Sequence, residues 1–189
     1  MDPPSTDFHI RYAIKDDMHH ILNLIKELAI YEKELQSVEA TEEKLLTTLG
    51  FNSQQPGPAY AKALLLFSRD DEAQAYIIPS NLASPAGIAL YFHNYSTWRA
   101  APGIWLEDLF VREKYRGRGY GTALITALAR EVERINGGRL EWSVLKWNTP
   151  SINFYESENI GAKCMSEWQT MRVDGDQLKK LASKGPAVL

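Results

Sequence analysis

Three glycines at alternate positions make the segment Arg116–Thr122 (Arg-Gly-Arg-Gly-Tyr-Gly-Thr) a candidate anion-binding turn. Without a Cβ at these glycines, neighbouring backbone N–H groups can converge on one ligand. A helix expected from Tyr120 to Ile135 directs the positive end of its dipole at the same point. Arg116 and Arg118 add two cations suited to phosphate oxygens. The turn therefore predicts a site for a phosphorylated ligand.

Two well-known phosphate-binding motifs do not fit this turn. A nucleotide P-loop closes with Gly-Lys-Ser or Gly-Lys-Thr, which is missing here. A dinucleotide-binding turn has the spacing G-x-G-x-x-G directly after the first strand, whereas these glycines lie in mid-chain with the spacing G-x-G-x-G. An Arg/Gly-rich surface turn without a ligand remains the alternative.

The elements that must position this turn follow from the hydropathy pattern. We expect strands at Phe8–Ala13, Ala59–Ser68, Gly87–Tyr95, Ile104–Val111, Arg139–Lys146 and Glu167–Val173, and helices beginning near Asp16, Thr41, Tyr120 and Pro150. One helix separates two of these strands, which predicts a parallel crossover. We therefore predict a single α/β (α+β) domain over 1–189, with its core at about 8–173, polar tails and a polar insertion at 69–85.

Composition limits the classes to which this protein can belong. The chain has 189 residues, of which 44% are hydrophobic, enough for a packed core. A net charge of −3 disfavours a nucleic-acid binder. The lone cysteine, Cys164, excludes an intramolecular disulfide, and we expect it to be a buried structural thiol. We find no metal-ligand spacing, no membrane span and no signal peptide, and expect a cytoplasmic protein.

Two segments together resemble the acetyl-CoA signature of the GNAT acetyltransferases: Leu106–Gly121, and Trp147–Tyr155. The resemblance spans nearly the whole chain and is strongest to the spermidine/spermine (diamine) acetyltransferases. Tyr95–Trp98 reads Tyr-Ser-Thr-Trp where true polyamine acetyltransferases have Asp-Pro-Trp, so the chain looks nearer to the thialysine branch. The resemblance implies a mixed, mostly antiparallel sheet flanked by helices, and a homodimer.

Acetyl-CoA is the cosubstrate that the resemblance implies, without a metal. The implied cofactor-binding residues are Leu109, Phe110, Val111, Arg116, Gly117, Arg118, Gly119, Tyr120, Gly121, Thr122, Asn148 and Ser151. Pantetheine would run along residues 109–111 like an added strand. A polar residue before Pro150 would also serve as a helix cap, so Asn148 has a structural interpretation too.

The resemblance implies opposite catalytic roles, an acid and a base, for two residues. Tyr155 matches a general acid that protonates the departing thiolate. Glu107 matches a base for the acceptor, because a primary amine with a pKa near 10.4 is mostly protonated at neutral pH. Asp108 would face the other side of the strand, so only one carboxylate of the pair can point into the site. For Tyr155 the structural alternative is an aromatic residue of the core. For Glu107 it is a carboxylate in solvent on an edge strand.

The acceptor implied by the resemblance is a small cationic amine. The matching substrate-binding residues are Tyr31, Glu32, Trp98, Glu141, Trp142 and Glu167. Glu32 lies in a run of charged residues and equally suits a solvated helix face. The spacer Glu156–Ile160 after Tyr155 is longer than the family usually shows. Acetylation of a protein lysine or N-terminus, and a catalytically idle CoA-binding sensor, remain open as alternatives.

Overall fold

The structure is a computed structural model that describes residues 7–52, 54, 57–70 and 84–185. Its sheet has the order β1 (Phe8–Tyr12), β2 (Lys62–Ser68), β3 (Gly87–Ser96), β4 (Ala101–Val111) and β5 (Leu140–Trp142). Neighbours from β1 to β4 pair antiparallel, and β5 pairs parallel to β4. The crossover between β4 and β5 is α4 (Tyr120–Arg134). The predicted mixed α/β sheet with a parallel crossover is confirmed.

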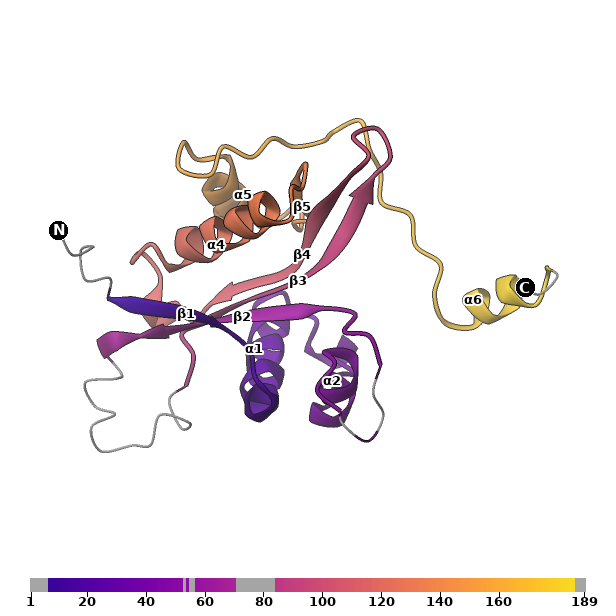
Figure 1. Ribbon diagram of the computed structural model, residues 1–189, viewed down its shortest axis with the longest axis horizontal. Coiled ribbons are helices and arrows are strands. Elements are labelled where there is room, and N and C mark those ends of the chain that lie inside the picture. The colour runs from indigo at the N-terminus through magenta and orange to yellow at the C-terminus, as the bar shows by residue number, and fades with distance from the viewer. Residues whose placement is uncertain (1–6, 53, 55–56, 71–83, 186–189) are drawn as a thin grey trace.

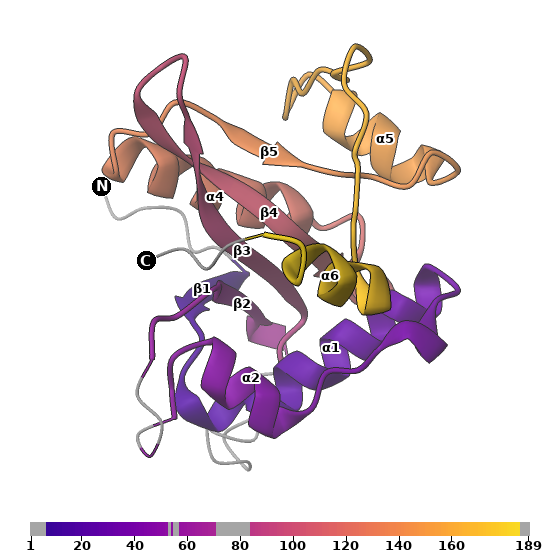
Figure 2. The ribbon, with the colours of Figure 1, turned by 90° about the vertical axis from the view of Figure 1, so that its right-hand side faces the viewer.

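Helices cover both faces of this sheet (Figures 1 and 2). On one face lie α1 (Met18–Tyr31) and α2 (Glu42–Thr48), and on the other lie α4 and α5 (Thr149–Glu156). Short 3-10 turns occupy Lys15–Asp17 (η1), Leu35–Ser37 (η2) and Glu113–Tyr115 (η4), and α6 (Gly175–Ala182) lies near the C-terminus. The sheet is thus the middle layer of three.

Helix starts follow local hydrogen bonding. Thr41 caps α2 as its sequence predicts, because its Oγ1 accepts the Lys44 N–H at 3.2 Å. Asp17 is the N-cap residue of α1, but its carboxylate makes no cap hydrogen bond; it accepts the Ile14 N–H at 2.7 Å and pairs with Arg11 at 2.6 Å. That carboxylate therefore ties β1 to the turn before the helix.

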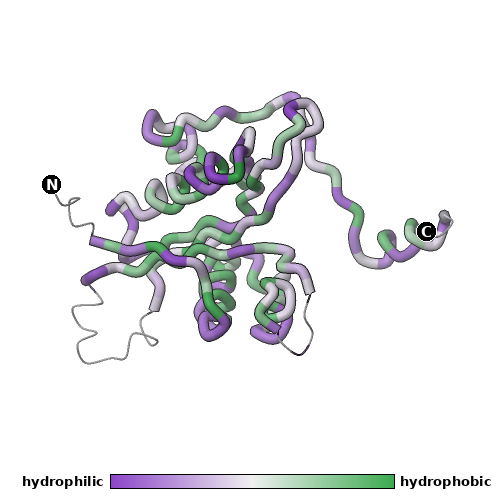
Figure 3. The backbone as a smooth tube through the Cα atoms, viewed as in Figure 1, coloured by the Kyte–Doolittle hydropathy of each residue, from purple (hydrophilic) through white to green (hydrophobic). Residues whose placement is uncertain are grey.

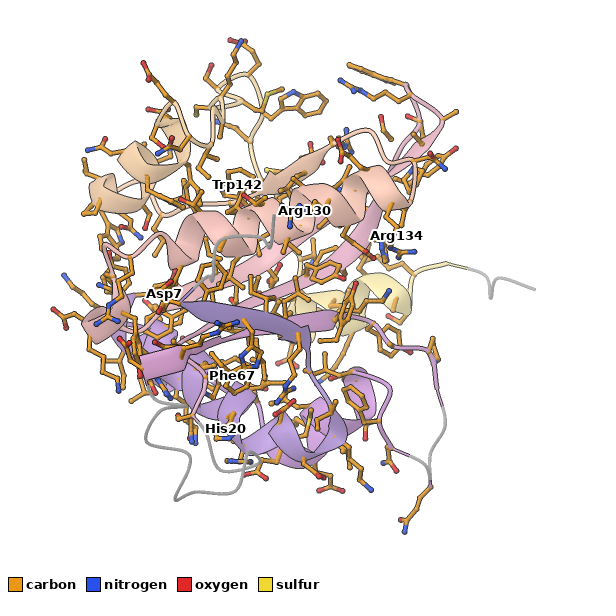
Figure 4. The ribbon with its side chains drawn as sticks, turned by 60° about the vertical axis from the view of Figure 1, so that its left-hand side comes forward. Asp7, His20, Phe67, Arg130, Arg134 and Trp142 are labelled. Carbon is orange, nitrogen blue, oxygen red and sulfur yellow. The ribbon has the colours of Figure 1, made fainter. Side chains whose placement is uncertain are left out.

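Each face of the sheet buries its own apolar cluster. The cluster beneath α4 includes Leu66, Tyr91, Leu106, Leu124 and Leu128. The cluster beneath α1 includes Ile21, Leu24, Leu65, Phe67 and Ile88, and Phe67 is labelled in Figure 4. The hydrophobic central strands of Figure 3 supply both clusters, because alternate side chains of a strand point to opposite faces.

A β-bulge interrupts this alternation in β4. Leu90 of β3 is paired with Asp108, and the next residue, Tyr91, is paired with Leu106, so Glu107 is left without a partner. As a result Leu106 and Leu109, three residues apart, both pack in the cluster beneath α4. The bulge lies immediately after the last residue of β4 that pairs with β5, Leu106.

Four expectations need correction or fall outside the described residues. The strand expected at Arg139–Lys146 is only three residues long, because β4 offers β5 partners at Ile104–Leu106 alone. Glu167–Val173 forms no strand, since no strand of the described chain lies beside it to pair with. Cys164 is exposed and not buried. Most of the 69–85 insertion lies outside the described residues.

The described helices include none that is both long and apolar enough to cross a membrane. Within the same residues, no three His, Cys, Asp or Glu side chains gather as metal ligands would.

Candidate active site

The diverging ends of β4 and β5 open a cavity of about 550 Å³. Its walls come from the C-terminal end of α1, the second half of β4, the start of α4, and the segment from β5 into α5. The expected site residues that line it are Tyr31, Glu32, Glu107, Leu109, Phe110, Val111, Arg116, Gly117, Gly119, Tyr120, Gly121, Thr122, Trp142, Asn148, Ser151 and Tyr155. Residues from four separate elements thus meet around one space.

The glycine turn presents free backbone donors to this cavity. Gly117 and Gly119 have φ angles of 77° and 79°, which favour glycine. The first hydrogen bond of α4 runs from the Ala123 N–H to the Gly119 carbonyl at 2.9 Å, so the three N–H groups at 120–122 have no acceptor within the helix. The side chain of Tyr120 is buried and donates to Ser68 Oγ at 2.9 Å, which leaves its backbone as the part that can bind a ligand.

Close packing behind the turn fixes its position. A Cβ at Gly121 would lie 3.2 Å from Cζ of Phe154, so α4 and α5 approach closely at this glycine. A Cβ at Gly117 or Gly119 would meet nothing within 4 Å. The turn is therefore open on the cavity side and supported on the other, as an anion site at a helix N-terminus requires. These residues fit the pyrophosphate of acetyl-CoA.

The two arginines of the turn have different partners. The Nε of Arg116 donates to the Val111 carbonyl at 3.0 Å, and its guanidinium lies 5.1 Å from the centre of the Tyr31 ring. Arg118 does not line the cavity, because its guanidinium is bound to the carboxylate of Asp70. Arg116 is thus the cation that this structure offers within the cavity wall.

A hydrogen-bonded bridge joins α1 to α5 across the cavity wall. The hydroxyl of Tyr31 donates to Oδ1 of Asn148 at 2.9 Å, and the same oxygen accepts the Ser151 N–H at 3.3 Å. Asn148 is therefore the N-cap of α5, as the structural interpretation predicts, and it also holds the end of α1. Tyr31 lies between this cap and the Arg116 guanidinium.

Tyr155 lies on α5 against two aromatic rings. Its ring centre is 4.8 Å from that of Trp142 and 5.2 Å from that of Phe154. Burial, together with the negative charge of Glu32, raises the pKa of Tyr155 to about 12. The phenol is therefore protonated throughout the physiological pH range and has a proton to donate.

Three carboxylates gather near the β4 bulge. Glu107 lines the cavity and accepts a hydrogen bond from Trp105 Nε1 at 3.0 Å. Asp108 does not line the cavity, and burial raises its pKa to about 6, with the charges of Glu107 and Glu32 adding to the effect. Burial also raises the pKa of Glu32. This clustering of acids favours a cationic group beside Tyr155.

Three expected substrate residues lie outside the cavity. Trp98 is 89% exposed at the turn between β3 and β4, where its ring lies 6.4 Å from that of Trp168. Glu141 is paired with Arg139 at 2.6 Å and accepts from Asn94 at 2.8 Å. Glu167 is exposed in the segment after α5. Local pairing and the extended path of the chain keep these side chains away from the other site residues.

Several wall residues were not among the individual site residues expected from the sequence, although some of them lie within the two segments of the acetyl-CoA signature. The set consists of Leu28, Leu106, Tyr115, Ser143, Val144, Leu145, Pro150, Phe154 and Asn159. Helical spacing could have found Leu28, because it lies three and four residues before Tyr31 and Glu32 on one face of α1. No local signal marks Asn159, which lies beyond the end of α5.

Comparison with known proteins agrees with this geometry. The model of the acetyltransferase (GNAT) family matches residues 35–160. An L-ornithine N5-acetyltransferase of Arabidopsis thaliana is 33% identical over 91% of this chain and 86% of its own length. A thialysine N-epsilon-acetyltransferase of Bos taurus is 33% identical over 93% of this chain and 97% of its own.

Solved structures share the fold. An integron cassette protein of V. cholerae superposes with a TM-score of 0.71 at 23% identity, covering 95% of this chain and all of that one. The family match covers the turn, the bulge and Tyr155, and the two relatives extend the likeness to nearly the full chain. This chain therefore belongs to the GNAT acetyltransferase family, enzymes that acetylate amines.

Proposed function

We propose that this enzyme transfers acetyl from acetyl-CoA to the primary amine of a small cationic molecule, by direct attack within a ternary complex. The observation that carries the proposal is that one cavity is lined both by groups that bind anions and by groups that bind cations. Backbone N–H groups and Arg116 suit a polyanionic cofactor, whereas Glu32 and Glu107 suit a cationic acceptor. Each ligand would meet charge of the opposite sign within the same 550 Å³ space.

Glu107 prepares the acceptor in this proposal. An ammonium cannot attack a carbonyl, because its nitrogen has no free electron pair. The Glu107 carboxylate accepts one ammonium proton, directly or through a water molecule, and the neutral amine then attacks. The bulge supports this role, since it releases Glu107 from pairing with β3 at the point where β4 enters the cavity.

Tyr155 completes the transfer. Acetyl-CoA, when bound, supplies the acetyl group as a thioester. The Tyr155 hydroxyl donates its proton to the sulfur as the carbon–sulfur bond breaks, so CoA leaves as a thiol. Its raised pKa keeps that proton in place until it is needed. A new carbon–nitrogen bond replaces the thioester bond, and the proton that the nitrogen loses on becoming an amide restores the Tyr155 phenol, so no covalent intermediate forms on the protein.

The acceptor class follows from charge and from the relatives. The ornithine and thialysine enzymes are named for side-chain amines of amino acids. We infer the same class here, the terminal amine of a small amino acid or diamine. Glu32 and the neighbouring Asp108 would attract a second ammonium group while Glu107 serves the reacting one.

Release of CoA thiol tests the proposal across an acceptor panel. Purified enzyme is given acetyl-CoA with ornithine, thialysine, lysine, spermidine or short peptides carrying a lysine or a free N-terminus. We expect thiol release with one or more of the small amines. Activity on peptides alone would make the enzyme a protein acetyltransferase, and binding of acetyl-CoA without any acetylation would make it a CoA sensor.

A further inference from the structure

The helix α1 ends at a lysine with an unusual backbone conformation. The N–H of Glu34 donates to the Ala29 carbonyl at 2.8 Å, which closes α1 as a Schellman motif. Lys33 occupies the left-handed position of this motif, with a φ of 64°. The helices α2 and α4 end in the same motif, but there the left-handed residues are Gly50 and Asn136, the types that this conformation favours. A lysine at such a position points to a function for its side chain.

The Lys33 side chain reaches from α1 to the segment that joins β5 to α5. Its Nζ lies 5.4 Å from the centre of the Trp147 ring. Glu32 directly precedes Lys33, and Asn148 directly follows Trp147; both Glu32 and Asn148 line the cavity. Lys33 itself is exposed. Its ammonium group therefore lies at the solvent-facing rim of the cavity, next to residues of the wall.

Lys33 forms no ion pair with any carboxylate in the described parts of the chain. Glu34, its neighbour in sequence, instead accepts hydrogen bonds from Gln36 Nε2 and Ser37 Oγ, both at 2.9 Å. The face of the Trp147 ring attracts the cation but leaves its N–H groups able to donate. The Lys33 ammonium group can therefore bind an anionic group that arrives with a ligand.

The proposed acceptors differ in one group that a lysine can recognise. Ornithine carries an α-carboxylate, whereas putrescine is the same molecule with a hydrogen atom in place of that carboxylate. We infer, resting on the proposed function, that Lys33 binds the α-carboxylate of the acceptor and so selects amino acids over diamines. Glu32 would then hold the α-ammonium group while Glu107 serves the side-chain amine.

Charge favours this selection in two ways. The carboxylates of Glu32, Glu107 and Asp108 repel an acceptor carboxylate, so an amino acid needs a cation at its carboxylate end. Lys33 supplies that cation, since Arg116 belongs to the phosphate-binding turn. A diamine brings no anion to offset the repulsion between Lys33 and its second ammonium group. Lys33 thus attracts one class of acceptor and repels the other.

Selectivity between the two matched acceptors tests this role. The kcat/KM values for ornithine and putrescine are measured for the wild type, Lys33→Gln, Lys33→Glu and Lys33→Arg. The wild type should favour ornithine. Lys33→Gln should lower the ornithine-to-putrescine ratio by ~10-fold, mainly through the KM for ornithine, because one charge-assisted hydrogen bond is lost. Lys33→Glu should reverse the preference, and Lys33→Arg should retain it.

Two features of the design keep the comparison clean. Each variant leaves a residue other than glycine at a φ of 64°, so the backbone strain is retained. Lys26→Gln is the matched control, because Lys26 is an exposed lysine of the same helix that does not line the cavity. It should leave the ornithine-to-putrescine ratio unchanged. A wild type that favours putrescine, or a ratio that Lys33→Gln does not alter, would overturn the inference while acetyl transfer itself persists.

Calorimetry separates this inference from the proposed function and from a role in cofactor binding. The dissociation constant of acetyl-CoA should change by less than about twofold in Lys33→Gln; a loss of about tenfold or more would assign Lys33 to a CoA phosphate instead. If the wild type acetylates neither acceptor, the proposed function fails. Ornithine binding to the CoA-bound enzyme then decides the role of Lys33: a ~10-fold weaker affinity in Lys33→Gln would support it, and absent or unchanged binding would overturn it.

Discussion

Replacing Asp108 by asparagine should stabilise the fold, because the native carboxylate is ionised at a site that disfavours its charge. Burial and the neighbouring charges of Glu107 and Glu32 raise the pKa of Asp108 from 3.8 to about 6. Asparagine has nearly the same shape and carries no charge. Asp108→Asn therefore removes the electrostatic cost and leaves the packing in place.

The size and sign of the effect follow from this pKa difference. At about 1.4 kcal/mol per pKa unit, the interval from 3.8 to about 6 corresponds to at most ~3 kcal/mol. A raised carboxyl pKa means that the folded state holds the proton more tightly than the unfolded chain does. The wild type is therefore penalised fully above pH 6, and the penalty disappears as the pH falls towards 3.8.

Urea unfolding at several pH values measures this difference. The gain in unfolding free energy for Asp108→Asn should approach ~3 kcal/mol at pH 8 and about half of that at pH 5. Asp16→Asn is the matched control, because Asp16 is exposed and its replacement should change stability by less than about 0.5 kcal/mol. A variant no more stable than the wild type at pH 8, or a gain that does not depend on pH, would refute the reasoning.

Three further substitutions probe the cavity itself. Tyr155→Phe should lower kcat by ~10²-fold or more while the dissociation constant for acetyl-CoA, measured by calorimetry, stays within about twofold; equal turnover would remove the phenol from the mechanism. Glu107→Gln should lower kcat/KM by ~10²-fold at neutral pH and recover towards pH 10, where the amine loses its proton unaided, so a loss that is the same at every pH contradicts a proton-acceptor role. Gly121→Ala should cost ~1–3 kcal/mol of stability and weaken acetyl-CoA binding, because the new Cβ presses on Phe154 at 3.2 Å, whereas Gly57→Ala, with nothing within 4 Å, should change neither.

Local patterns made much of the fold predictable. The glycine turn, the following helix and the crossover to β5 depend on residues close together in sequence, and the structure has them as expected. The cap at Thr41 is equally local. Such features are read from one segment at a time, because backbone conformation and short-range hydrogen bonds determine them.

Long-range pairing determined the features that the sequence did not reveal. Strict alternation puts Leu106 and Leu109 on opposite faces of β4, but the bulge at Glu107 places both beneath α4. Glu141 lies on a strand, as expected, but its carboxylate pairs with Arg139 and accepts a hydrogen bond from Asn94 outside the cavity. The extra residue of a bulge and the partner of a surface carboxylate depend on the neighbouring strand, which no single segment specifies.

Transfer of isotopically labelled acetyl tests the central claim most directly. Enzyme, labelled acetyl-CoA and ornithine are combined for a single turnover, and mass spectrometry locates the label. We predict labelled acetyl on an amine of the acceptor, with none on the protein, and loss of that product in Tyr155→Phe. Label found only as free acetate, or held covalently by the enzyme, would contradict direct transfer between two ligands in this cavity.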